Sequence, residues 1–441
     1  MNQNKNWVKN IDKLADTPQK KIMFELVNTM FNSIDTEKIV ENHVAVNQNI
    51  LSINGQTFDL SHYNRIRVIA FGKASCEAAG TLEKILGNRI HEGIIIDIKE
   101  TKCEIIESFV GTHPRPSMAN VIATKNIFEF AKDTNDKDLV LVAVSGGGSA
   151  LLCSSEDECN QGQKLYDDFL RGGGTIKELN IVRKHISTLK GGGLAKLFYP
   201  ATVVGLIFCD VSGGYYDEVA SGSTFRDTTT IDDARKIIDK YKLEGFSLIE
   251  TPKEDIYFEK VVNIPMISNI IALEAISQKA KELGMSAKII SSEIFDSAEI
   301  TIKNFIEASK DIDPVRGRGT LRALAASNGT DVIIGGGEIT VSVKGNKGSG
   351  GRCLYLAMSV LPFLKENQVF AAIASDGMDN CDSAGAVVDI NSYKKSQELG
   401  LDLKKYIEDA DAYSFFEKTG ELIMTGPTGA NVADIMILLN K

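Results

Sequence analysis

The feature that most constrains the fold is a repeated alternation of short apolar runs with helix-like stretches. Several runs rich in Val and Ile end directly at glycine before the next helical stretch begins. The clearest are "IRVIAFG" at 66–72, "DLVLVAVSGGG" at 138–148 and "DVIIGGG" at 331–337. Strands that are apolar along their whole length are buried on both faces, as in parallel sheets covered by helices. The pattern therefore predicts an α/β protein built of three-layer α/β/α domains with mostly parallel sheets.

Length and local patterning predict two domains. With 441 residues, 43% of them hydrophobic, the chain can bury more than one core. The segment at 246–260, "FSLIETPKEDIYFEK", loses periodicity and gathers a proline and several charges. We therefore expect a first domain at 1–255, with a helical N-terminal segment to about residue 46, and a second at 256–441. A further break at 311–320, "DIDPVRGRGT", is interpreted as a surface loop inside the second domain.

Composition argues against a role on nucleic acid or in a membrane. The net charge is -10 and no block of basic residues is present, so the electrostatic footprint of a nucleic-acid-binding protein is missing. No apolar run reaches the eighteen or so residues of a membrane span. The seven cysteines show no C-x-x-C spacing, which is typical of free thiols in a reducing compartment. We expect a cytoplasmic protein, a monomer or homodimer, that binds small molecules.

A glycine turn bracketed by serines follows the apolar run at 138–144. Backbone N–H groups at such a turn, "SGGGS" at 145–149, can hold a phosphate without any side-chain charge. The alternative is a tight turn whose small residues allow close packing. Other glycine-rich segments lie at 172–174, 191–193, 335–337 and 345–351. None of them completes G-x-G-x-x-G, and the Gly-Lys pair at 72–73 lacks the rest of a Walker A motif, so dinucleotide enzymes and P-loop kinases are disfavoured.

Basic residues near these turns could balance the charge of a polyanion. Lys73 follows the strand-like run at 66–71 directly and opens a helix, so it is expected at the ligand-binding edge of the sheet. The segment at 180–196, "NIVRKHISTLKGGGLAK", gathers further candidates, namely Arg183, His185, Lys190, Gly191 and Gly192. Its alternative is a solvated basic helix. Arg352 lies in the glycine-rich "KGSGGRC", where a guanidinium could reach phosphate or carboxylate oxygens.

Acidic residues at the ends of apolar runs are the complementary candidates. Asp210, Glu338 and Asp376 each follow such a run closely and could hold magnesium or act as a base. Magnesium in phosphoryl transfer needs only one or two protein carboxylates, so not all of them are expected to be ligands. His113, in "GTHPRPS", could be an acid–base group, although a histidine in a proline-rich loop is more often structural.

Taken together, the motifs resemble those of two-domain glycerate 2-kinases, whose C-terminal half is called MOFRL. The matching segments, in order, are "GKAS", "GTHPRPS", "AVSGGGSALL", "ELNIVRKHISTLKGGGLAK", "CDVSGGYYDEVASGST", "GGGEITVSVKGNKGSGGR", "SDGMDNCDSAGA" and "TGPTGANVADI". The resemblance implies transfer of a phosphoryl group from ATP, with Mg²⁺, to the 2-hydroxyl of D-glycerate in a cleft between the two domains. It also implies that the MOFRL region begins near residue 330, and that Lys73 and Arg352 flank the cleft.

These considerations give each candidate an expected role. The catalytic residues are Lys73, Arg352 and Asp210; the phosphate site is Ser145, Gly146, Gly147, Gly148, Ser149, Lys190, Gly191 and Gly192; the hydroxy-acid site is Arg183, His185 and Glu338; the metal ligands are Asp210 and Asp376. Departures from the family pattern occur at Gly214, Cys353, Tyr355 and Asn380. Two alternatives therefore stay open: a kinase for a different small hydroxy acid, and a catalytically weak member that binds its ligands without turnover.

Overall fold

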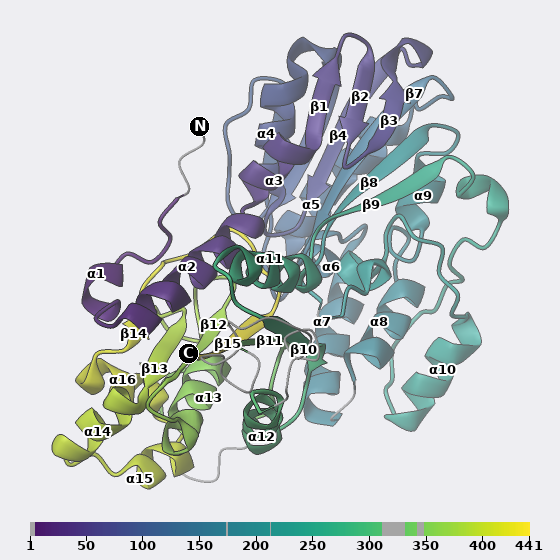
Figure 1. Cartoon of the computed structure of the whole chain (residues 1–441). Helices are drawn as coiled ribbons and strands as arrows, with labels where there is room; N and C mark the ends of the chain where they lie inside the picture. The colour runs from purple at the N-terminus through teal and green to yellow at the C-terminus, as the bar shows by residue number, and fades with distance from the viewer. Residues whose placement is uncertain (1–4, 173–174, 212, 311–330, 342–347) are drawn as a thin grey trace. The chain divides into compact units, whose positions relative to one another are not determined.

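The protein is described here by a computed structural model that covers residues 5–172, 175–211, 213–310, 331–341 and 348–441 (Figure 1). The chain forms two compact units. The parallel-sheet unit consists of Thr36–Val211 and Tyr215–Ile267, and the mixed-sheet unit of Met1–Asp35, Ser212–Gly214 and Ser268–Lys441. Each unit is built around a six-stranded sheet, which confirms the predicted α/β class. The predicted break at 311–320 lies outside the described residues.

The parallel-sheet unit has the strand order β6-β5-β4-β7-β8-β9, and every neighbouring pair is parallel, as predicted for this half. Its strands are β4 (Arg65–Phe71), β5 (Ile90–Asp97), β6 (Ile106–Val110), β7 (Asp138–Ser145), β8 (Thr202–Phe208) and β9 (Val261–Ile267). The order runs outward in both directions from β4 and β7. Ligands of open α/β sheets bind at such a switch point, beyond the carboxyl ends of the strands.

Helices cover both faces of this sheet. Helix α4 (Ser75–Leu86) packs on β4, β5 and β7, and α5 (Met118–Ala131) packs on β5 and β6. The two crossovers run in opposite directions along the sheet, so right-handed connections place the two helices on opposite faces. The unit also contains α3 (Thr36–His43), α6 (Gly148–Leu151), α7 (Glu156–Gly172), α8 (Ile176–His185), α9 (Gly193–Leu197), α10 (Ile231–Lys240) and a small antiparallel sheet of β1 (Val44–Asn47), β2 (Ile50–Ile53) and β3 (Gln56–Asp59).

The mixed-sheet unit departs from the predicted parallel arrangement. Its order is β10-β11-β15-β12-β13-β14, and among these neighbours β10 and β11 are parallel while the other pairs are antiparallel. The strands are β10 (Ala287–Ile294), β11 (Val332–Gly337), β12 (Gln368–Ala374), β13 (Gly385–Asp389), β14 (Leu422–Ile423) and β15 (Asp434–Asn440). The C-terminal strand β15 inserts between β11 and β12 and runs against both, so continuous apolar character here reflects burial on two faces and not strand direction.

The first helices of the chain belong to the mixed-sheet unit, which differs from the expected boundary at residue 255. Thr17 caps α2 (Pro18–Ser33) by accepting a hydrogen bond from the backbone N–H of Lys20, as the Thr-Pro pair predicts. Helix α2 packs against α11 (Asn269–Glu282) and β12. The other helices of the unit are α1 (Ile11–Leu14), α12 (Ala298–Ala308), α13 (Arg352–Val360), α14 (Ile390–Glu398), α15 (Leu403–Glu408) and α16 (Ala412–Thr419). Within the described residues, none of the helices has the length and apolar character that a membrane crossing requires.

Candidate active site

Two turns interlock where β4 and β7 end. The backbone N–H of Lys73 donates to the carbonyl of Gly146 at 2.9 Å, and that of Ala74 donates to Oγ of Ser145 at 3.1 Å. Gly72 has φ +118°, and a Cβ placed there would lie 2.1 Å from the same serine oxygen. Ser145 therefore braces the two turns against each other, and its hydroxyl is committed to protein contacts instead of the predicted phosphate contact.

The three glycines after β7 each make room for a different neighbour. A Cβ on Gly146 would lie 1.9 Å from Oδ2 of Asp210, so that carboxylate rests against the turn. Gly147 is left-handed at φ +85°, and its Cβ position is 3.1 Å from both Cγ of Lys73 and Cδ2 of His113. Gly148 begins α6, which is only four residues long. The turn thus gathers an acid, a lysine and a histidine around bare backbone.

Two cations near this turn have no carboxylate partner within the described residues. These are Lys73 and Arg183; the guanidinium of Arg183 makes one long contact, 3.5 Å from Nη1 to Oδ1 of Asn180. Burial lowers the pKa of Arg183 to about 10, so it stays charged at neutral pH. Burial, Lys73 and Arg183 together lower the pKa of His113 to about 4. A neutral imidazole between two unpaired cations is an environment that favours an anionic ligand.

Hydroxyl and amide groups extend the site beyond the glycine turn. Oγ of Ser149 lies 2.8 Å from Oγ of Ser221, which is 3.3 Å from Oδ1 of Asn180. Asn180 in turn donates to Oε2 of Glu218 at 2.6 Å. Ser221 and Asn180 are not among the predicted site residues, although both lie within motifs that carry the family resemblance. Ser221 and Asn180 become candidates because Ser221 contacts Ser149 and Asn180 contacts Ser221 in the fold, and these contacts cannot be predicted from spacing in the sequence.

Lys190, predicted to bind phosphate, has its partners within the protein. Its ammonium group donates to the carbonyl of Leu152 at 2.9 Å, to Oε1 of Glu158 at 2.7 Å and to Oγ of Ser187 at 3.3 Å. Both members of the Lys190–Glu158 pair are buried, with side chains 5% exposed. An ammonium group has three N–H donors, and all three are used here. Lys190 is therefore a structural cation.

The neighbouring predicted residues are also committed to the fold. The N–H groups of Gly191 and Gly192 donate to the carbonyls of Ser221 and Gly222, both at 2.9 Å, so neither is available to a phosphate. His185 is fully buried, with Nδ1 2.9 Å from the carbonyl of Ile181 and Nε2 3.2 Å from Oε1 of Glu250. Of the basic segment at 180–196, Arg183 is the predicted residue whose charge remains available.

In the mixed-sheet unit, Arg352 begins α13 and is held by two carboxylates. Nε donates to Oδ2 of Asp434 at 3.0 Å, and Nη1 donates to Oε2 of Glu338 at 2.8 Å. Asp379 accepts from the N–H groups of Cys353 and Leu354 and so fixes the start of the helix. Glu338, predicted to bind substrate, instead orients the arginine. The guanidinium remains 39% exposed and keeps N–H donors for a ligand.

Burial raises the pKa of Asp434 to about 7; Arg352 opposes this rise, whereas Asp379 and Glu338 add to it. Among the described residues, no group of three or more potential metal ligands gathers in one place. Asp376 forms a local turn in which Oδ1 accepts from the N–H of Met378 at 3.0 Å. Residues 173–174 and 345–347 of two predicted glycine-rich segments lie outside the described residues.

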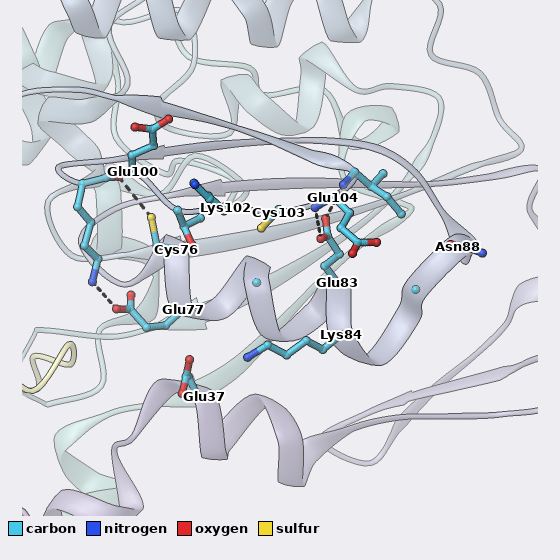
Figure 2. Close-up of a pocket in the computed structure, with 15 residues that line it drawn as sticks. Glu37, Cys76, Glu77, Glu83, Lys84, Asn88, Glu100, Lys102, Cys103 and Glu104 are labelled. Atoms are coloured by element: carbon cyan, nitrogen blue, oxygen red, sulfur yellow. Dashed lines mark hydrogen bonds and ion pairs between the residues drawn. The ribbon is translucent and has the colours of Figure 1, made fainter.

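A large crevice in the parallel-sheet unit lies away from these residues. It has a volume of about 620 Å³ and lies between α4 and the segment at 99–105 (Figure 2). Three of its charged groups have partners in the protein: Lys99 pairs with Glu77, and Glu83 accepts from the N–H groups at 104–106. No residue predicted for the active site is among those that line this crevice in the described part of the chain.

Known proteins resemble this chain along nearly its whole length. Residues 22–250 match the domain of unknown function DUF4147, and residues 331–434 match the MOFRL family. A glycerate 2-kinase from Pyrococcus horikoshii is 32% identical over 95% of this chain and 97% of its own. The crystal structure of a glycerate kinase from Thermotoga maritima has a TM-score of 0.81 at 30% identity, covering 96% of this chain and 99% of that one. A relative from Agrobacterium vitis, provisionally named a hydroxypyruvate reductase, is 33% identical over 85% of this chain and 87% of its own.

Proposed function

Because the chain belongs to the glycerate 2-kinase family, in which a DUF4147 domain precedes a MOFRL domain, we propose that it transfers the γ-phosphoryl group of ATP to the 2-hydroxyl of D-glycerate. One observation carries the proposal: among the described residues, Lys73 and Arg183 are cations without a carboxylate partner, and they lie near the glycine turn at 146–148. Both proposed reactants are anions, a polyphosphate and a carboxylate. Phosphoryl transfer depends mostly on positioning and on neutralising the charge of the moving group.

The chain's own residues divide this work. Lys73 and Arg183 bind and neutralise anionic oxygens, while Gly147 keeps the space beside them free of a side chain. Within the mixed-sheet unit, Arg352 is a further candidate cation for an anionic ligand, oriented by Asp434 and Glu338. A preorganised charge donor of this kind contributes about a hundredfold or more to turnover.

Asp210 is the residue best suited to hold Mg²⁺. Its carboxylate lies against Gly146 at the end of β8, and carboxylate oxygens are the donors that magnesium prefers. Asp376 is a second candidate in the other unit, although one of its oxygens already accepts a backbone hydrogen bond. Magnesium held by Asp210 would neutralise charge on the phosphate oxygens.

The reductase named for one relative is a weaker candidate, because no glycine-rich segment of the sequence completes a dinucleotide fingerprint. A second candidate function is phosphorylation of another small hydroxy acid. The sequence departs from the family pattern at Gly214, Cys353, Tyr355 and Asn380, and these departures favour a different substrate. We further propose a cytoplasmic location, supported by seven cysteines that form no disulfide. The assembly proposed is a monomer or homodimer.

A coupled ADP-release assay tests the proposal. D-glycerate, erythronate and related acids are supplied with ATP and Mg²⁺, and hydroxypyruvate is supplied separately with NADH or NADPH. We expect ADP release with D-glycerate and a product with phosphate on the 2-oxygen by ³¹P NMR. No ADP release with any acid, or oxidation of the nicotinamide, would contradict it.

Lys73→Ala is expected to lower turnover by about a hundredfold or more. Its matched control is Lys132→Ala, at an exposed lysine that pairs with Glu129 on the surface. A folded Lys73→Ala protein with wild-type turnover would remove Lys73 from the mechanism.

A further inference from the structure

His113 lies on a loop that is fastened to the glycine turn. After β6, the N–H of Thr112 donates to Oδ1 of Asn120 at 2.9 Å. The amide nitrogen of Asn120 donates to the carbonyls of Thr112 and Ala150, at 3.0 and 2.9 Å. Asn120 is fully buried. One buried amide therefore ties the loop bearing His113 to α6, the helix that the glycine turn begins.

The imidazole of His113 lies at the open side of that turn. A Cβ placed on Gly147 would lie 3.3 Å from Nε2 of His113 and 3.1 Å from Cγ of Lys73, so both side chains border the same glycine. Neither ring nitrogen has a hydrogen-bond partner within the described part of the chain. His113 is exposed, so its polar edge is available to a ligand, while the loop that carries it is fastened by Asn120.

We infer that Nε2 of His113 accepts the hydrogen bond of the attacking hydroxyl and takes its proton during phosphoryl transfer. The inference rests on the proposed kinase function. In the step, the hydroxyl oxygen of the acid bonds to the γ-phosphorus, and the bond from that phosphorus to the β,γ-bridging oxygen breaks. The electron pair leaves with ADP, and the hydroxyl proton moves to Nε2.

The surrounding charges suit this role. Lys73 faces the ring from the β4–α4 turn and Arg183 from α8, and with burial they keep the imidazole neutral above about pH 5. The carboxylate of Asp210, which follows β8, rests against Gly146 of this turn. Protein kinases likewise use a weakly basic group, an aspartate, to orient the hydroxyl and receive its proton. The two cations then favour rapid loss of the proton from the imidazolium to water.

The test compares His113→Gln and His113→Ala with wild type, measuring kcat and KM for D-glycerate and for ATP. We expect kcat to fall about 10²–10⁴-fold, the usual contribution of a positioned acid–base group, while both KM values change less than about threefold. Added imidazole should restore part of the kcat of His113→Ala, an effect that a structural role does not produce. His62→Gln, at an exposed histidine, is the matched control.

The outcomes separate the inference from the proposed function. If the wild type phosphorylates none of the acids, the kinase proposal fails. If the wild type is active and folded His113→Gln keeps a kcat within threefold of it, the inference is overturned. If the variants do not fold, the wild type still provides a test: its imidazole C2–H resonances, from five histidines, are titrated by NMR. The His113 resonance is assigned as the one that shifts in Lys73→Ala. If it shows that the imidazole stays neutral down to pH 5, the inference is supported. If the imidazole titrates near pH 6.5, the inference is contradicted.

Discussion

Replacing Lys190 distinguishes a structural lysine from a ligand-binding one. Lys190→Met removes one member of a buried ion pair and leaves Glu158 without its cation. Burial alone would raise the pKa of Glu158, but Lys190, with hydrogen bonds from Lys190, Ser154 and Ser187, holds it below its ordinary value. Breaking a buried pair on one side costs about 3–5 kcal/mol. Domains of about 150–250 residues lose about 2–4 °C of Tm per kcal/mol, so we expect a loss of about 6–20 °C.

The assay is differential scanning calorimetry at pH 8 and pH 5, together with KM for ATP in the folded protein. Glu158 in the variant can take up a proton at the lower pH, so the loss of stability should be smaller there. The double variant Lys190→Met/Glu158→Gln should recover part of the loss, because no unpaired charge remains. Trp7, the single tryptophan, lies in the mixed-sheet unit, and its fluorescence serves as an internal control for the unit left unchanged.

A Tm within about 2 °C of wild type, combined with a KM for ATP raised tenfold, would refute this reasoning. That result would mean that Lys190 contacts phosphate and that its three protein acceptors contribute little. An unchanged KM with a lowered Tm is the result that the structure predicts.

Three further substitutions probe other parts of the site. Arg183→Met should raise KM for substrate at least tenfold. Its Tm should be unchanged or higher, because the substitution removes a buried charge that has no carboxylate partner in the described residues. A fall of more than about 2 kcal/mol in stability would contradict this. Gly147→Ala should abolish most activity, because its Cβ would lie against Lys73 and His113. Gly55 has the same φ of +85° with nothing within 4 Å, so Gly55→Ala should keep its activity and cost about 1 kcal/mol of stability. Equal activities of the two variants would disprove the close approach of these side chains to Gly147. Asp434 keeps its proton in the folded state up to about pH 7, whereas the unfolded chain loses that proton near pH 4. Wild-type stability should therefore fall by about 3 kcal/mol as the pH rises from 4 to 7. Asp434→Asn should remove that slope in urea unfolding followed by Trp7 fluorescence, and an unchanged slope would show that the carboxyl titrates normally.

Much of the parallel-sheet unit follows from sequence, because β4 and β7 are apolar on both faces and end at glycine. The same pattern gave no information on strand direction in the other unit. There, β11 is antiparallel to β15, and this pairing joins segments separated by nearly a hundred residues. An apolar run shows that a strand is buried on both faces. Whether it is parallel or antiparallel depends on which strand pairs with it, which the run itself does not reveal.

The position of a candidate residue could be predicted where that residue follows a strand end. Lys73 and Gly146 lie directly after β4 and β7, so topology alone brings them together. The pairing of Lys190 with Glu158 could not be predicted, because a lysine beside glycines has the same local sequence whether it faces a ligand or a distant buried acid. The position of His113 depends on Asn120, whose side chain links two loops in a way that spacing cannot predict.

The division of the chain also sets an order of events during synthesis. Helix α2 is made long before its packing partners α11 (Asn269–Glu282) and β12 (Gln368–Ala374). At about 5–20 residues per second, roughly 10–50 s separate the emergence of α2 from that of α11. Strand β9 ends two residues before α11 begins, so the parallel-sheet unit is complete only when the first packing partner of α2 is being made. Meanwhile the face of α2 that carries Met23, Phe24, Leu26, Val27, Met30 and Phe31 stays uncovered, which makes it a natural binding site for chaperones on the nascent chain.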